Sequence, residues 1–338
     1  MKIGIANDSP LAVEALRRVL QGAGHSVVWV ATDGREAVAQ CKIVRPDILL
    51  LDLRMPVMDG VECTRRIMAE APCAILLVTA TVSGNYTQVY DAMGAGALDA
   101  VNTPQLGSGG DLGGGKPLLD KIDVIAKLVA PRPIGSKRIS QPIPVVDDAP
   151  SLVAIGASTG GPDALARVLG DLRSHDEAAV VIVQHVDAEF AGGLAEWLAS
   201  RSGFKTALIG EGDTPRAGVA LIAATNDHLV MRPGRVLGYQ IQPRRVPYRP
   251  SVDVFFRSLA SAWPRRAIAV LLTGMGEDGA EGLRDLRQLG WNTIAQDESS
   301  SVVYGMPRAA AELGAATHVL ALPDIGPRII AGLRAARR

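Results

Sequence analysis

The sequence has few cysteines, no excess of charge of either sign and no long apolar run, and each absence excludes a class of protein. Its three cysteines, Cys41, Cys63 and Cys73, fit neither a metal site nor an even set of disulfides, so a reducing compartment is expected. The 35 basic and 35 acidic residues cancel, which gives no reason to expect nucleic acid as a partner. No apolar run approaches the ~20 residues that span a bilayer, and the polar start is no signal peptide. We therefore expect a cytoplasmic protein without membrane insertion.

What the sequence does contain is two series of alternating strand-like and helix-like stretches. In the first, over residues 1–130, amphipathic stretches separate five apolar runs: Ile3–Ala6, Val27–Ala31, Ile48–Asp52, Ile75–Thr79 and Leu98–Val101. This alternation predicts an α/β domain with a five-stranded, doubly wound parallel sheet. A second series, over residues 151–338, predicts a Rossmann-like parallel-sheet domain. Residues 131–150 hold five prolines and no periodicity, which predicts a linker.

The most informative motif is the stretch L-V-A-I-G-A-S-T-G-G at residues 152–161. An apolar run typical of a buried strand ends in G-A-S-T-G, which matches the G-x-S-x-G nucleophile elbow and would present Ser158 on a sharp corner. The following helix begins around Pro162, and its free N–H groups would face negative charge that develops near Ser158. A glycine-rich nucleotide-binding loop has a similar pattern. The two interpretations must therefore be distinguished by the residues elsewhere in the chain that could act with Ser158.

A serine nucleophile needs a base that takes its proton. His185 ends the apolar run V-V-I-V-Q-H, which places it at the same sheet edge as Ser158 if the strands are parallel. His228 follows another strand-like run, G-V-A-L-I-A-A-T-N-D, and is the alternative base. We expect His228 to lie in a polar loop and His185 to be the base.

The base in turn needs an acid that orients it. Asp278 lies in L-L-T-G-M-G-E-D-G-A at 271–280, where a strand again leads through a glycine turn into a helix. Glu277 and Asp297 are alternatives. Because three strand ends would then bring three different functional groups to one edge, the sequence favours a serine hydrolase. The chain order Ser, His, Asp differs from that of α/β-hydrolases, which argues against that fold.

Polar side chains also gather at one edge of the first predicted sheet. Asp52 ends I-L-L-L-D, and Asn7 and Asp8 follow the first strand, so two carboxylates and an amide should converge. Such oxygen ligands suit Mg²⁺, which would neutralise a phosphoryl group on Asp52. Thr79 ends the fourth strand at the same edge, where its hydroxyl would reach that phosphoryl group. Solvated strand-end acids are the alternative, and the spacing D-L-R-M-P-V-M-D-G at 52–60 argues against it.

Residues 1–105 resemble the response-regulator receiver family. The similarity lies in D-S-P-L-A-V-E-A-L-R-R, D-L-R-M-P-V-M-D-G, V-T-A at 78–80 and G-A-x-D before the fifth strand. It implies that Asp52 accepts a phosphoryl group from a histidine kinase and that Thr79 takes part in the switch. It also implies that Mg²⁺ is held by Asp8, Asp52 and the backbone carbonyl of Arg54.

Three positions depart from the receiver pattern. Asn7 stands where the family has an acid, which removes one negative metal ligand. Thr103 replaces the lysine that pairs with the acceptor, and Ala100 stands where a switching aromatic residue is usual. Phosphorylation is still expected, with a weaker metal site.

The C-terminal motifs resemble the catalytic domain of chemotaxis protein-glutamate methylesterases of the CheB type. The similar blocks are G-A-S-T-G-G, Q-H, R-P-S-V-D at 249–253, T-G-M-G-E-D-G-A and A-Q-D-E-S-S-S-V-V-Y-G-M-P-R at 295–308. The resemblance implies a nucleophile, Ser158, a general base, His185, and an orienting acid, Asp278. It further implies that the Met275 N–H contributes to an oxyanion hole and that Thr159 supports the elbow.

The activity that this resemblance implies is hydrolysis of glutamate γ-methyl esters on a methyl-accepting chemoreceptor, through an acyl-enzyme and without a cofactor. Some relatives also deamidate glutamine. N-D-S at 7–9 and N-T-P at 102–104 are most similar to the branch that serves surface-sensing, chemosensory-like pathways. The alternative is a regulator that acts by stoichiometric sequestration through a degraded receiver, and the complete Ser158, His185 and Asp278 set favours the enzyme.

An arginine-rich arm follows the second histidine candidate. Residues 228–252 contain five arginines and no acidic residue, and a receptor methylation helix is rich in glutamates. Arg249, in the R-P-S-V-D block, is the candidate for substrate docking. The alternative is a solvated hairpin.

Overall fold

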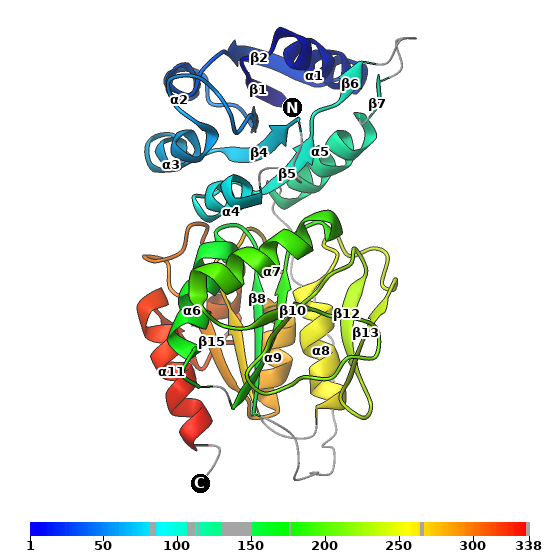
Figure 1. Cartoon of the computed structure of the whole chain (residues 1–338), viewed down its shortest axis with the longest axis vertical. Coiled ribbons are helices and arrows are strands. Elements are labelled where there is room, and N and C mark those ends of the chain that lie inside the picture. Colours follow the sequence, from blue (N-terminus) through cyan, green and yellow to red (C-terminus); the bar gives the residue numbers. More distant parts are fainter. Residues whose placement is uncertain are drawn as a thin grey trace. The chain divides into compact units, whose positions relative to one another are not determined.

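The computed structural model of the chain describes residues 1–80, 86–106, 112–113, 115–129, 151–175, 177–263 and 267–335 (Figure 1). Contacts between Cα atoms divide the chain into two compact units, Met1–Ala130 and Pro131–Arg338. The predicted linker, residues 131–150, lies outside the described residues. No helix in the described part of the chain is long and apolar enough to cross a membrane.

The first unit is a parallel sheet with strand order β2-β1-β3-β4-β5. Its strands are β1 (Lys2–Ala6), β2 (Ser26–Ala31), β3 (Ile48–Leu51), β4 (Ala74–Thr79) and β5 (Asp99–Asn102), followed by the short antiparallel pair β6 (Gln105–Leu106) and β7 (Leu112–Gly113). Its helices are α1 (Pro10–Gly22), α2 (Gly34–Ile43), α3 (Gly60–Glu70), α4 (Tyr86–Gly94) and α5 (Gly115–Val129). The predicted five-stranded, doubly wound sheet is confirmed, with strand ends shifted by at most one residue.

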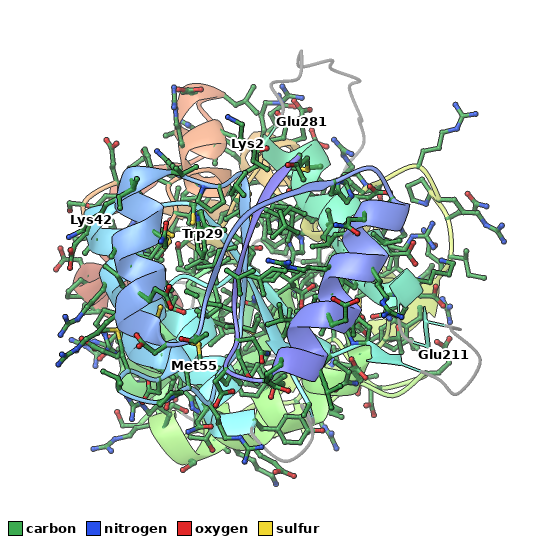
Figure 2. All side chains as sticks on the ribbon, turned by 90° about the horizontal axis from the view of Figure 1, so that it is seen from above. Lys2, Trp29, Lys42, Met55, Glu211 and Glu281 are labelled. Carbon is green, nitrogen blue, oxygen red and sulfur yellow. The ribbon has the colours of Figure 1, made fainter. Side chains whose placement is uncertain are left out.

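Two helical layers explain why the central strands are apolar without alternation. Every residue of β3 and β4 is buried, as expected for parallel strands covered on both faces. On β1, a Cβ atom at Gly4 would lie 2.5 Å from the ring of Trp29, so only glycine fits beneath that indole (Figure 2). At the surface, Lys42 of α2 forms an ion pair with Glu70 of α3 and joins these two neighbouring helices (Figure 2).

The second unit is a seven-stranded parallel sheet with strand order β10-β11-β9-β8-β14-β15-β16, which confirms the predicted parallel-sheet domain. Its strands are β8 (Ser151–Ala157), β9 (Ala178–Gln184), β10 (Thr206–Leu208), β11 (Ala220–Ile222), β14 (Ile268–Leu271), β15 (Asn292–Gln296) and β16 (His318–Leu320); β12 (His228–Arg232) and β13 (Val236–Gln240) form a separate antiparallel pair. Its helices are α6 (Gly161–Leu172), α7 (Ala188–Ser202), α8 (Val252–Ala262), α9 (Ala280–Gln288), α10 (Met306–Glu312) and α11 (Leu322–Ala335) (Figure 1).

The register of three central strands determines what meets at the carboxyl edge of this sheet. Strand β8 lies between β9 and β14, with Ala157 beside Gln184 and Gly156 beside Leu271. The segments that follow these strands therefore begin side by side. They contain all three members of the predicted serine hydrolase site.

Candidate active site

Ser158 lies on a tight turn directly after β8. Its N–H donates to the Thr273 carbonyl at 3.0 Å, and its own carbonyl accepts from the Gly161 N–H at 2.8 Å, where α6 begins. Between them Gly160 has φ 76°, and a Cβ atom there would lie 2.6 Å from Val302 Cβ. Left-handed backbone and lack of space both require glycine at this position. The turn thus has the predicted strand-to-helix form.

The structure brings His185 and Asp278 together. His185 Nε2 lies 2.8 Å from Asp278 Oδ2, and the two side chains are only 10% and 4% exposed. His185 Nδ1 is buried and has no hydrogen-bond partner among the described residues. Because an ionised carboxylate only accepts hydrogen bonds, the ring proton lies on Nε2 and Nδ1 presents a lone pair. The ring is therefore reversed relative to the trypsin-type triad, in which Nδ1 contacts the acid.

The N-terminus of α8 binds the Asp278 carboxylate. Ser251 Oγ donates to Oδ1 at 2.7 Å, the Val252 N–H to Oδ2 at 2.7 Å, and the Asp253 N–H to Oδ1 at 3.2 Å. Burial opposes ionisation, but the hydrogen bonds from His185, Ser251 and Val252 outweigh it and hold the pKa of Asp278 below its ordinary value. The acid is thus a fixed anion at neutral pH.

The half-buried Asp253, in the first turn of α8, binds the next helix, α9, in a similar way. Its Oδ1 accepts the Gly282 N–H of α9 at 2.6 Å, while Asp278, just before α9, caps α8. Burial and the nearby Asp278 charge raise the pKa of Asp253 to about 7. The first turns of α8 and α9 therefore each bind a carboxylate from the other segment.

The alternative acids have other surroundings. Glu277 is exposed. Asp297 accepts hydrogen bonds from Ser299 Oγ at 2.8 Å and Ser300 Oγ at 2.6 Å, within its own turn. Of the three candidates, Asp278 is the one that contacts His185.

His228 does not lie in a polar loop, as the sequence suggested, but is the fully buried first residue of β12. Its Nδ1 accepts the Ser251 N–H at 3.2 Å, so its Nε2 donates to the Pro243 carbonyl at 3.1 Å. With both ring nitrogens bonded to backbone, His228 connects the two ends of the loop over residues 243–251. The polar residues before His228 suggested a loop, and its partners Pro243 and Ser251 are too distant in the sequence to be recognised from it.

The loop after β14 carries the predicted oxyanion donor. The Met275 N–H has no acceptor among the residues that the structure describes, whereas the Gly274 N–H donates to the Val303 carbonyl at 3.0 Å. Thr159 is buried, and its carbonyl accepts from Thr273 Oγ1 at 2.8 Å. The elbow and the Met275 loop are thus joined through one threonine hydroxyl.

Sequence reasoning missed the side chains that hold these loops. Gln184 Nε2 donates to the Ser158 carbonyl at 2.8 Å, and Gln296 Oε1 accepts the Thr273 N–H at 2.8 Å. Tyr248 stacks on His185. Both glutamines lie in sequence blocks shared with the methylesterase family, so that resemblance could have indicated them. Tyr248 immediately precedes the R-P-S-V-D block and had no such indication.

The arginine-rich arm contains both bonded and free cations. Arg249 donates through Nη2 to the Arg244 carbonyl at 2.9 Å, and Arg232 pairs with Glu211, at the rim in Figure 2. Arg244 and Arg245 are exposed and form no ion pair with any described residue. A docking role for Arg249 stays a prediction.

In the first unit, Asn7 and Asp52 meet at the carboxyl edge. Asn7 Nδ2 donates to Asp52 Oδ2 at 3.1 Å, and the Leu53 N–H donates to Oδ1 at 2.7 Å. Burial raises the pKa of Asp52, and the charge of Asp8 adds to this, while the Arg54 and Leu53 N–H groups oppose it. Asn7 Oδ1 is occupied by the Ser9 N–H at 2.8 Å.

The other predicted switch residues lie nearby. Thr79 is buried at the end of β4, and its carbonyl accepts the Thr103 N–H at 2.9 Å. Ala100 is fully buried on β5. No group of three or more His, Cys, Asp or Glu side chains in the described ranges is placed to hold a metal, so the carboxylates available are those of Asp8 and Asp52.

The second unit thus has the side chains of a serine hydrolase, and the first has the sheet and acidic edge of a signal receiver. A CheB methylesterase family model matches residues 153–329, and a response regulator receiver domain model matches residues 3–105. The chain belongs to the CheB methylesterase family and carries a receiver domain.

Individual relatives are similar to this protein over nearly its whole length. "Protein-glutamate methylesterase/protein-glutamine glutaminase 3" of Burkholderia orbicola is 54% identical over 334 residues, covering 98% of each chain. A protein of the same name from Pseudomonas aeruginosa is 52% identical over 330 residues, covering 97% of this chain and 98% of its own. The crystal structure of the Thermotoga maritima CheB methylesterase catalytic domain is 32% identical, with a TM-score of 0.52, and covers 54% of this chain and 98% of its own.

We predict that His228→Gln lowers the free energy of unfolding by about 1–3 kcal/mol, because a buried donor or acceptor loses its partner. The same change should reduce kcat far less than His185→Gln. Urea denaturation and methyl-ester hydrolysis measure the two effects, with His175→Gln, at a partly exposed position outside the site, as a control that changes neither. A greater loss of kcat in His228→Gln than in His185→Gln would show that the base is misassigned.

Proposed function

We propose that this protein is a protein-glutamate methylesterase, also able to act as a protein-glutamine glutaminase, whose activity is regulated by phosphorylation of its receiver. Residues 1–130 form the receiver, 131–150 the linker and 151–338 the catalytic domain. The substrate is a methyl-accepting chemoreceptor, and a histidine kinase supplies the phosphoryl group. The observation that supports catalysis most strongly is the His185–Asp278 pair, whose unpartnered Nδ1 lies at the edge that carries Ser158. A purely sequestering regulator would have no need of it.

In the proposed reaction, Ser158 Oγ attacks the carbonyl carbon of the glutamate γ-methyl ester while His185 Nδ1 takes the hydroxyl proton. The negative charge on the ester oxygen is stabilised by the free Met275 N–H and by the first turn of α6. The C–O bond to the methoxy group then breaks, and His185 returns the proton so that methanol leaves. A water molecule, deprotonated by His185, hydrolyses the acyl-enzyme to glutamate and free Ser158. With glutamine the leaving group is ammonia.

The supporting residues keep these groups in place before substrate binds. Asp278 fixes the protonated nitrogen of His185 and stabilises the imidazolium that forms during transfer. Thr159, through its carbonyl bond to Thr273, holds the elbow against the Met275 loop. In the proposed mechanism, side chains and backbone N–H groups of the catalytic domain thus supply the nucleophile, the base, the acid and the oxyanion donors.

We expect Ser158→Ala to reduce methanol release from methylated receptor by about 10⁴-fold or more, because loss of a nucleophile leaves only binding and oxyanion stabilisation. Stability should be unchanged. The matched control is Ser174→Ala at an exposed site, which should behave as wild type. Full activity in Ser158→Ala would overturn the serine mechanism.

For the receiver, we propose that Asp52 is the phospho-acceptor and that Asp8, Asp52 and the Arg54 carbonyl hold Mg²⁺. The two carboxylates fit a hard cation, since a cation would relieve the repulsion from Asp8 that helps to raise the pKa of Asp52. Asn7 does not contribute an oxygen, because its Oδ1 accepts from Ser9 and its amide group faces Asp52. When bound, Mg²⁺ would neutralise the incoming phosphoryl group beside Thr79.

Asn7→Asp should strengthen Mg²⁺ binding by about tenfold, because an added carboxylate raises the ligand charge that sets affinity for hard cations. Magnesium titration of the unphosphorylated protein measures this directly. Asp52→Ala should abolish labelling by a small phosphodonor in either background, with the exposed Asp47→Ala as the control. Labelling that persists in Asp52→Ala would contradict the assignment.

The arginine arm supports a route for receptor docking. Arg244 and Arg245 are exposed and form no ion pair among the described residues, and Tyr248 of the same loop contacts His185. An acidic helix held by these arginines would therefore lie beside the catalytic base. Arg249 supports this surface through its bond to the Arg244 carbonyl.

Charge reversal at both positions, Arg244→Glu with Arg245→Glu, should raise KM for the receptor by about tenfold or more and leave kcat unchanged. The wild-type KM should rise with salt, and that of the double variant should not. Arg173→Glu, a single charge reversal at the exposed end of α6, is the control. Equal KM values in wild type and double variant would exclude docking at this arm.

A further inference from the structure

We propose that Tyr248 is a positioning residue that fixes both the catalytic base and the oxyanion loop. The proposal rests on the function proposed above, because it assigns roles to His185 and Met275. It adds a fourth side chain to the site, one that does not react but determines where two reacting groups lie.

The first contact is with the base. The rings of Tyr248 and His185 are stacked, with centroids 4.1 Å apart and planes at 10°, and Tyr248 is only 8% exposed. The hydrogen bond to Asp278 restrains one corner of the imidazole but leaves the ring free to tilt about it. A parallel ring against one face removes that tilt. It also places π electrons over the imidazole that becomes positively charged during proton transfer, which favours the charged form.

The second contact is with the oxyanion loop. Tyr248 Oη donates to the Met275 carbonyl at 3.2 Å. On the other side of the same loop, the Gly274 N–H is bonded to the Val303 carbonyl at 3.0 Å. The peptide N–H of Met275 therefore lies between two anchored positions, and its direction is set before the ester carbonyl arrives.

Tyr248 is itself held in place. His228 bonds the Pro243 carbonyl and the Ser251 N–H, which closes the loop on both sides of position 248. Ser251 Oγ continues the network to Asp278 at 2.7 Å. One loop thus contacts the base through Tyr248, the acid through Ser251 and the oxyanion donor through the Tyr248 hydroxyl. This arrangement explains why a fully buried histidine is placed at the start of β12.

Two variants separate the two contacts. Tyr248→Phe keeps the ring and loses the hydroxyl, so kcat should fall about threefold to tenfold, the equivalent of one neutral hydrogen bond. Tyr248→Leu also loses the stacked ring, and kcat should fall by about a further tenfold. KM for the receptor should be unchanged in both, because Tyr248 acts on the reacting groups. Labelling of Ser158 by a fluorophosphonate should slow in the same order, since that reaction needs the same base and oxyanion donor but no receptor.

Tyr239→Phe is the matched control. Tyr239 also has a bonded hydroxyl in this region, to the Ile209 carbonyl at 3.0 Å, but it does not contact the site. Its loss should lower stability without changing kcat or labelling, which separates positioning from general support of the fold. Thermal denaturation of each variant shows whether the fold is kept, and Tyr248→Phe remains informative if Tyr248→Leu unfolds.

The outcomes are distinguishable from failure of the proposed function. If wild type releases no methanol from any methylated receptor, the methylesterase proposal fails, while fluorophosphonate labelling still tests the positioning role. If wild type is active and Tyr248→Phe matches it in kcat and in labelling rate, the hydroxyl has no role and the proposal is overturned. Equal losses in Tyr248→Phe and Tyr239→Phe would likewise overturn it.

Discussion

The catalytic unit depends on one buried anion, the carboxylate of Asp278. A buried charge is tolerated only where donors replace the lost water. Here the donors are the first turn of α8 and His185, so a single interaction holds the helix, orients the base and joins β14 to the rest of the edge. Free N–H groups at the start of a helix are destabilising when they lack acceptors, and in this molecule they bind the Asp278 carboxylate.

Glycines allow α8 to come close enough for that interaction. A Cβ atom at Gly156 of β8 would lie 2.3 Å from Val252 Cγ1, and one at Gly279 would lie 2.7 Å from the same atom. Val252 is the first residue of α8 and donates to Asp278. Any side chain at either glycine would move the helix start away from the acid. By leaving room for Val252, Gly156 and Gly279 therefore allow the hydrogen bond that stabilises the Asp278 charge, in addition to close packing.

The fold and the outline of the site could be predicted from the sequence because both follow from local patterns. Apolar runs give parallel strands, and the first polar residue after each run lies at the carboxyl edge, which places Ser158 and His185 at the ends of neighbouring strands. The sequence favoured Asp278 as the acid but left Glu277 and Asp297 as alternatives, since residues in turns have no periodicity to distinguish them. The structure distinguishes them, because Asp278 contacts both His185 and the first residue of α8, 26 residues earlier in the chain.

The roles of His228 and Tyr248 were not predictable for a related reason. His228 follows four polar or small residues, A-T-N-D, which suggested a loop, yet its partners lie 15 and 23 residues further along the chain. Tyr248 is surrounded by prolines and arginines that indicate a solvated arm, and its stacking partner lies on a different strand segment. In the receiver, by contrast, the departure at Asn7 was visible in sequence, but the direction of its amide was not.

The first turns of α8 and α9 each bind one carboxylate, Asp278 and Asp253 respectively, and the two acids make the stability of the domain depend on pH in opposite senses. Asp278 has a lowered pKa, so its contribution to stability is present above its unfolded pKa and is lost as pH falls through the folded value. Asp253 has a pKa raised to about 7, so its folded environment favours the protonated form, and the stability that this contributes is present below the unfolded pKa and is lost as pH rises through the folded value. Two neighbouring acids thus contribute opposite pH dependences to the stability of one pair of helices.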